Sequence, residues 1–126
     1  MQLLYLFIRE KDLLSQYIPH FHTIEKIINH IESNFTKTYS VEELARMAGL
    51  SPSHFRLLFK RVTGFSVTQY QINMKINKAK DLLISGACNV SEAAYLLGFN
   101  NIYYFSRLFK KNTGVNPSDY LKGYGS

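Results

Sequence analysis

Apolar residues recur every three or four positions along most of the chain, which is the period of an α-helix. One stripe lies on a helix expected from Thr23 to Phe35 and consists of Ile24, Ile27, Ile28, Ile31 and Phe35. A second stripe, on a long helix expected between Ser66 and Gly86, consists of Ile72, Ile76, Ala79 and Leu83. A short helix is expected from Asn116-Pro117 to Tyr120. Because no segment alternates as a strand would, the pattern predicts an all-α fold of about seven helices.

The central part of the chain is repeated. Four residues recur 49 positions later, so that Val41, Glu43, Ala45 and Gly49 match Val90, Glu92, Ala94 and Gly98. Seven more recur 50 positions later, from Phe55, Leu58, Phe59, Lys60, Thr63, Gly64 and Tyr70 to Phe105, Leu108, Phe109, Lys110, Thr113, Gly114 and Tyr120. The change of offset places one inserted residue between Gly98 and Phe105. Two copies indicate a duplicated supersecondary unit.

Each copy is expected to form two helices joined by a tight turn. Capping boxes at Ser40–Glu43 and Asn89–Glu92 predict the starts of the first helices, and Gly49 and Gly98 predict their ends. The second helices are expected to begin at the caps Ser51 and Asn100, with Pro52 in the first turn of one, and to stop near Gly64 and Gly114. Such a pair is typical of a helix-turn-helix. The expected boundaries are about 40–64 and 89–114, with a linker helix at about 66–85, itself opened by a capping box at Ser66–Gln69.

The second helix of a helix-turn-helix normally enters the major groove with its N-terminal residues. Opposite the apolar faces lie Ser53, Arg56, Leu57 and Lys60 in one copy and Tyr103, Ser106, Arg107 and Lys110 in the other. Arg56 and Arg107 are the leading base readers, because arginine can bind guanine O6 and N7 bidentately. The polar residues Ser53, Ser106 and Tyr103 could contact bases or phosphates, and Leu57 is either a contact to a thymine methyl group or an ordinary exposed leucine.

The basic residues that follow are better placed for the DNA backbone. These are Lys60, Arg61, Lys110 and Lys111, with Arg46, Lys75, Lys78 and Lys80 as weaker candidates that could equally be solvated charges. The net charge of +6 is uneven, since residues 1–43 carry −2 and residues 44–118 carry +8. A basic block suits a polyanionic partner.

Other classes of function find little support. The pair His20 and His22 lacks a neighbouring ligand cluster, so no metal site is expected, and no cofactor loop or nucleophile with a paired base indicates an enzyme. His54 has a capping or packing role as a ready alternative to a phosphate contact. Cys88 is the single cysteine, which favours a structural role in a reducing cytoplasm. No run of eighteen apolar residues and no secretory signal pattern occurs, so no membrane association is expected.

From about residue 22 to 122 the chain resembles the DNA-binding region of the AraC/XylS family of bacterial transcription regulators. The strongest motif is Gly98-Phe99, then Tyr104 to Lys111, then Gly114, Pro117 and Tyr120, and the upstream motif is Ser40 to Ala48, Phe55, Phe59-Lys60 and Gly64. The resemblance implies two homeodomain-like helix-turn-helix units that bind adjacent major-groove segments of double-stranded operator DNA. By the same alignment the base-contacting positions are Ser53, Arg56, Leu57, Ile102, Tyr103, Ser106 and Arg107. Two departures are Lys75 and Leu121, where the family often has arginine.

Residues 1–19 lie outside this resemblance, and 20–126 form the expected DNA-binding domain. The apolar positions Leu3, Leu4, Phe7 and Ile8, followed by Leu13 and Leu14, predict an amphipathic helix. This helix is either the remnant of an upstream effector or dimerisation domain, a dimerisation or linker helix, or a helix folded onto the domain itself. A homodimer through this segment or a missing upstream domain is therefore expected, and RNA polymerase is a further expected partner of a transcription regulator.

Two other hypotheses compete with sequence-specific regulation. A helical module could use the basic faces to bind an acidic protein, and an architectural protein could bind DNA without regard to sequence. The duplicated arginine-bearing faces favour sequence-specific binding. The duplication also predicts a footprint of about 15–20 bp, with two major-groove contacts about 10 bp apart.

Overall fold

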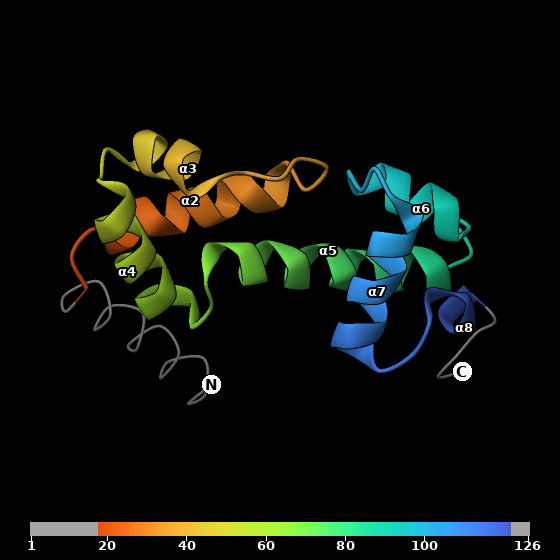
Figure 1. The fold of residues 1–126 in the computed structure, drawn as a ribbon. Helices are drawn as coiled ribbons and strands as arrows, with labels where there is room; N and C mark the ends of the chain where they lie inside the picture. Colours follow the sequence, from red (N-terminus) through yellow and green to blue (C-terminus); the bar gives the residue numbers. More distant parts are fainter. Residues whose placement is uncertain (1–17, 122–126) are drawn as a thin grey trace, which may run out of the picture. The chain divides into compact units, whose positions relative to one another are not determined.

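The computed structural model describes residues 18–121, and within this range the chain forms seven helices and no strand. In chain order these are α2 (Phe21–Ser33), α3 (Val41–Ala48), α4 (Pro52–Thr63), α5 (Val67–Ile84), α6 (Val90–Leu96), α7 (Ile102–Thr113) and α8 (Pro117–Leu121) (Figure 1). The predicted all-α fold is confirmed. The expected N-terminal helix falls mostly on residues 1–17, outside the described part of the chain.

The chain divides into two compact units, and the division does not follow the sequence order. The first unit consists of the chain up to Ser33 and of Tyr39–Thr68. The second unit consists of Asn34–Thr38 and of the chain from Gln69 onward. The five residues 34–38, here called the 34–38 segment, therefore belong to the same unit as α6 and α7, although they precede α3 in the sequence.

In the first unit three helices pack on one another around a phenylalanine-centred core. Helices α2, α3 and α4 all contact each other. Their buried apolar side chains are Phe21, Ile24, Ile27, Ile31, Leu44, Ala45, Phe55, Leu58 and Phe59. The rings of Phe55 and Phe59, one helical turn apart, lie 5.6 Å from centroid to centroid. This burial fixes which side of α4 faces outward.

The second unit buries an equivalent core against most of α5. One cluster joins α5, α6 and α7 and consists of Ile76, Ala79, Leu83, Ala93, Ala94, Leu97, Phe105 and Phe109. Three of the four residues in the predicted α5 stripe are buried there, and the fourth, Ile72, packs against the cluster as a partly buried residue. Cys88 also packs against it, as expected of a structural residue. Helix α8 contacts both α6 and α7, and its residue Tyr120 lies 5.2 Å from the Phe109 ring, centroid to centroid.

Most helix ends follow the predicted signals, with two displaced caps and one incomplete capping box. The C-cap of α6 is Leu97, one residue before the predicted Gly98. Asn89 and Glu92 make both bonds of a capping box. At Ser40 only one is present in the described structure, from the Glu43 backbone N–H to the Ser40 hydroxyl at 3.1 Å. The cap of α7 is Asn101, not Asn100, and its side chain accepts bonds from the backbone N–H groups of Tyr103 and Tyr104. The inserted residue thus precedes the cap, which keeps Asn101 fifty positions after Ser51.

Phe35 does not extend the apolar face of α2, contrary to the sequence prediction. The helix ends at Ser33, and Phe35 packs instead against the core of the second unit. There the ammonium group of Lys78 lies 4.5 Å from the centroid of the Phe35 ring. Phe35 follows Ile31 at the helical spacing of four residues, although the helix ends before Phe35.

Candidate DNA interface

Helix α4 turns a polar and basic face to solvent because its phenylalanines are buried. Its cap Ser51 accepts a bond from the His54 backbone N–H, and Pro52 occupies the first turn. Ser53, Arg56, Leu57, Lys60 and Arg61 are all exposed, and Leu57 is 53% exposed. The helix carries three basic residues and no acidic one. An exposed leucine among cations is the arrangement in which an apolar contact to a thymine methyl group is available.

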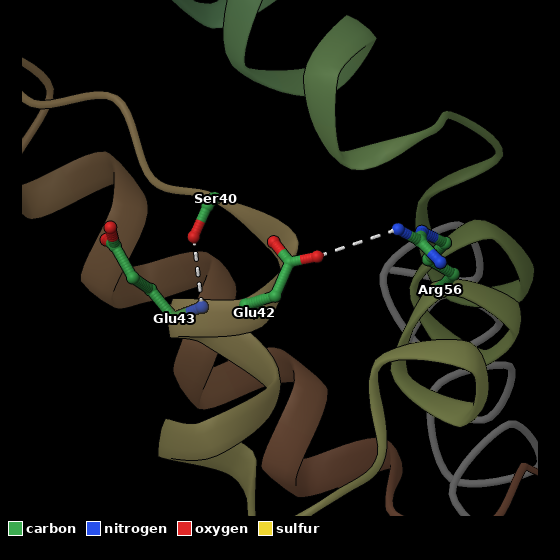
Figure 2. Close-up of polar contacts among 4 residues, drawn as sticks. All are labelled: Ser40, Glu42, Glu43 and Arg56. Atoms are coloured by element: carbon green, nitrogen blue, oxygen red, sulfur yellow. Dashed lines mark hydrogen bonds and ion pairs between the residues drawn. The ribbon is translucent and has the colours of Figure 1, made fainter.

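The guanidinium of Arg56 meets a carboxylate from the preceding helix (Figure 2). Its Nη2 lies 3.9 Å from Oε1 of Glu42, which stands in the first turn of α3. Both side chains remain more than half exposed, at 58% and 62%. An exposed ion pair of this kind contributes about 0–1 kcal/mol to stability, so it orients Arg56 without locking it in place.

Helix α7 presents a comparable face with a different chemistry. Tyr103 is 78% exposed and Arg107 is exposed, whereas Ile102 and Ser106 are half-buried along the edge of the helix. Lys110 and Lys111 are exposed in the last turn. Like α4, this helix has three basic residues and no acidic one. Tyr103 and Arg107 are therefore the most exposed of the expected base-contacting side chains on α7.

An aromatic ring, not a carboxylate, accompanies the arginine of α7. The guanidinium carbon of Arg107 lies 6.0 Å from the centroid of the Tyr104 ring, one turn back on the same helix. Tyr104 is in turn 6.2 Å from Phe99, centroid to centroid, in the turn before the helix. A cation at this distance from a ring is attracted by the ring quadrupole. Sequence reasoning missed this role of Tyr104, although its three-residue spacing from Arg107 was a usable signal.

Both second helices end in the same hydrogen-bonded arrangement. The hydroxyls of Thr63 and Thr113 donate to the carbonyls of Phe59 and Phe109 at 2.9 and 2.8 Å. Both are followed by a left-handed glycine that closes the helix. Lys60, Arg61, Lys110 and Lys111 lie in these last turns, where cations also interact favourably with the helix dipole. Arg46 is exposed in the last turn of α3.

Lys75 is not a surface cation, contrary to both roles that the sequence left open, a candidate contact to the DNA backbone or a solvated charge. Its side chain is buried at 3% exposure, and its Nζ donates to the hydroxyl of Thr38 at 2.7 Å and to the carbonyl of Leu97 at 2.9 Å. Burial lowers the pKa of Lys75 below its usual value. Lys75 therefore ties the 34–38 segment to the turn between α6 and α7.

That turn is also closed sterically by the 34–38 segment. Gly98 has a φ of +86°, and a Cβ atom at this position would overlap the backbone carbonyl of Thr36. At the corresponding Gly49, where φ is +70°, no atom lies within 4 Å of such a Cβ. The turn after α6 therefore requires glycine both for its left-handed backbone and for lack of space. The turn after α3 requires it for the left-handed backbone alone.

The three histidines singled out in the sequence each have a ring or a carboxylate as a neighbour. The rings of His20 and His54 lie edge to face, 5.7 Å apart, and His22 faces Glu25 at 3.9 Å. Within residues 18–121 no three His, Cys, Asp or Glu side chains converge as metal ligands would. None of the described helices is both long and apolar enough to cross a bilayer.

Known proteins share this arrangement. A helix-turn-helix domain family model matches residues 44–123. The transcriptional activator Btr of Bacillus subtilis is 38% identical over 99 residues, which are 79% of this chain and 19% of Btr. The solved DNA-binding domain of the transcription factor AdpA, in complex with a target DNA, is 25% identical with a TM-score of 0.76, covering 80% of this chain and 91% of that one. A probable AraC family regulator from Rhodopseudomonas palustris is 27% identical with a TM-score of 0.70, covering 80% and 95%.

The match to the family model begins within α3 and covers α4, the long helix α5, α6 and α7. Family and relatives are transcription regulators, and the domain that matches is the DNA-binding one, which performs no enzymatic reaction. The chain belongs to the AraC/XylS family of helix-turn-helix transcription regulators, as a DNA-binding domain of that family.

Proposed function

We propose that the chain recognises a specific operator with both helix-turn-helix pairs, α4 and α7 each entering a major groove. The two grooves would be successive segments of one duplex, about 10 bp apart, within a footprint of about 15–20 bp. One observation carries the proposal. On both helices, exposed hydrogen-bonding side chains near the N-terminal end lie opposite phenylalanines that are fully buried.

Within each helix, the position of a side chain along the helix axis suggests whether it contacts a base or a phosphate. The base-contacting set in the proposal is Ser53, Arg56, Leu57, Ile102, Tyr103, Ser106 and Arg107. The backbone-contacting set is Arg46, Lys60, Arg61, Lys110 and Lys111. Side chains near the start of a recognition helix reach base edges, whereas cations near its end face phosphates. Arg107 is exposed and bears the bidentate donors that guanine binds, so it is the leading reader of the second pair.

The test compares Arg107→Ala with Lys111→Ala, which removes the same charge one turn later. Arg107→Ala should weaken operator binding by about 1–3 kcal/mol and relax the preference at one or two base pairs. Lys111→Ala should weaken operator and scrambled DNA alike and lower the salt slope by about one ion. Affinities are measured on an operator selected from randomised duplexes and on its scrambled version, at several salt concentrations.

The outcomes separate the competing functions. If Arg107→Ala weakens both duplexes equally, Arg107 contacts phosphate, and sequence reading by α7 would fall to Tyr103 and Ser106. If the wild-type chain binds every duplex equally, it is an architectural DNA binder. If it binds neither duplex, its basic faces serve an acidic protein partner.

Three finer proposals rest on the family and on the sequence. RNA polymerase is proposed as a partner, and the relative Btr is a transcriptional activator by name. A cytoplasmic location is proposed for the same reason, since such regulators act on chromosomal DNA.

Self-association through residues 1–19 is proposed from their leucines, which lie outside the described residues. Deleting residues 1–19 should then lower the apparent mass in solution, and an unchanged monomeric mass would remove this idea.

A further inference from the structure

The contact between Glu42 and Arg56 places an acidic side chain beside the leading base reader of α4. A carboxylate close to a DNA-facing helix repels phosphates, and this repulsion alone weakens binding to any duplex. Only a specific effect on Arg56 would offset that loss. Glu42 lies in the first turn of α3 and Arg56 lies in α4, so the pair joins the two helices of one helix-turn-helix (Figure 2). Its geometry suggests such an effect.

We propose that Glu42 is a positioning residue for Arg56 that favours guanine over phosphate as the arginine's partner. The inference rests on the proposed function, in which Arg56 reads a base. The guanidinium carries five N–H donors, so a carboxylate at Nη2 leaves donors free for O6 and N7 of one guanine. Glu42 can therefore stay paired while Arg56 binds a base edge.

A phosphate contact is different, because it brings a second anion to the same guanidinium. The phosphate oxygens would then approach the Glu42 carboxylate, and either the ion pair breaks or two like charges are held close together. Guanine is neutral and imposes no such repulsion. The ion pair thus penalises non-specific contacts of Arg56 more than specific ones, and raises the ratio between operator and random-DNA affinity.

Glu43 supplies a matched control. It is the neighbouring residue in the same first turn, exposed and of equal charge, and Figure 2 shows its side chain directed away from Arg56. Glu42→Gln and Glu43→Gln therefore change the net charge equally and the helix-dipole interaction similarly. They differ in whether Arg56 loses its ion pair. The hydrogen bond that caps α3 uses the backbone N–H of Glu43, so neither substitution removes it.

The experiment uses the full chain and two duplexes, one selected by the wild-type chain from a randomised pool and one a scrambled version of it. Glu42→Gln should raise affinity for the scrambled duplex about 2–5-fold more than for the selected one. Glu43→Gln should leave the ratio of the two affinities unchanged, and Glu42→Asp should retain part of the wild-type ratio. In an Arg56→Ala background, Glu42→Gln should no longer change the ratio, because its action passes through Arg56.

Four results would overturn the proposal. Equal gains on both duplexes would make Glu42 a general electrostatic repellent, and unchanged affinity for both duplexes would leave it without a role in selection. An effect that persists in Arg56→Ala would mean that Glu42 contacts DNA directly, for example at a cytosine amino group. Failure of the pool to enrich any sequence would reject the proposed function itself, and the inference with it. Thermal unfolding of all variants identifies any change that comes from stability alone.

Discussion

In the first unit the outward arginine meets a carboxylate, whereas in the second it meets an aromatic ring. The ion pair with Glu42 neutralises part of the charge of Arg56, while the Tyr104 ring leaves that of Arg107 intact. The turns differ too, since Gly49 is open and Gly98 lies under the 34–38 segment. Duplicated helices with the same terminal threonine bonds can therefore carry different electrostatics and different tolerance to substitution.

The difference between the two turns predicts the largest effect. Gly98→Ala should destabilise the protein by about 2–5 kcal/mol, because a left-handed alanine is strained and its Cβ overlaps the Thr36 carbonyl. Gly49→Ala should cost only about 1–2 kcal/mol, the conformational part alone. Urea unfolding of both variants measures the difference. Equal losses would show that the 34–38 segment does not constrain the second turn.

The buried ammonium of Lys75 predicts the next effect. Lys75→Met leaves the Leu97 carbonyl without its donor, which should cost about 1–3 kcal/mol. The pKa of Lys75 is lowered in the folded state, so near and below about pH 10.4 the unfolded chain binds more protons at this position. The contribution of Lys75 to the free energy of unfolding should therefore rise as the pH increases towards that value.

The matching measurement is the free energy of unfolding of the wild type and Lys75→Met across the alkaline range. The advantage of the wild type should grow with pH, because the methionine side chain of the variant has no proton to lose. A difference that is constant with pH, or that shrinks, would contradict the assignment of a depressed pKa.

The smallest effect concerns the ring beside Arg107. Tyr104→Leu should lower the preference for operator over scrambled DNA about 2–5-fold, because an exposed cation–π contact contributes about 0.5–1 kcal/mol. Tyr104→Phe keeps the ring and should keep the preference. His54, the residue fifty positions earlier, provides the control, since its ring faces His20. If His54→Leu causes the same loss, the ring of Tyr104 has no particular role in positioning Arg107.

Local signals in the sequence predicted the helices well, because caps and apolar periods act over a few residues. Gly49, Gly64 and Gly114 end helices where expected, and the α5 stripe lies in the core. The cap of α7 was placed one residue too early, at Asn100, since the insertion precedes the cap. Phe35 and Lys75 were misplaced because their partners come from other parts of the chain.

The candidate interface could be predicted only as a set of outward positions. Exposure followed from the helical period once the phenylalanines were assigned to the core. The pairing of Glu42 with Arg56 joins two helices across a turn, and nothing in the spacing of fourteen residues indicates it. Whether a given outward side chain meets a base or a phosphate depends on the docked duplex, so those roles remain predictions.

The membership of the 34–38 segment has a consequence for recombination between related genes. A crossover placed just before α5 would transfer α6 and α7 without the five residues that cover their turn, because these lie upstream of α3. The chimera would combine Gly98 and Lys75 from one parent with Thr36 and Thr38 from another. Variants that fold and have a new operator specificity should therefore arise either by substitutions on the outer face of α7 or by crossovers upstream of residue 34. A fragment trimmed to residues 44–123, the part that the family model matches, would lose the covering segment altogether.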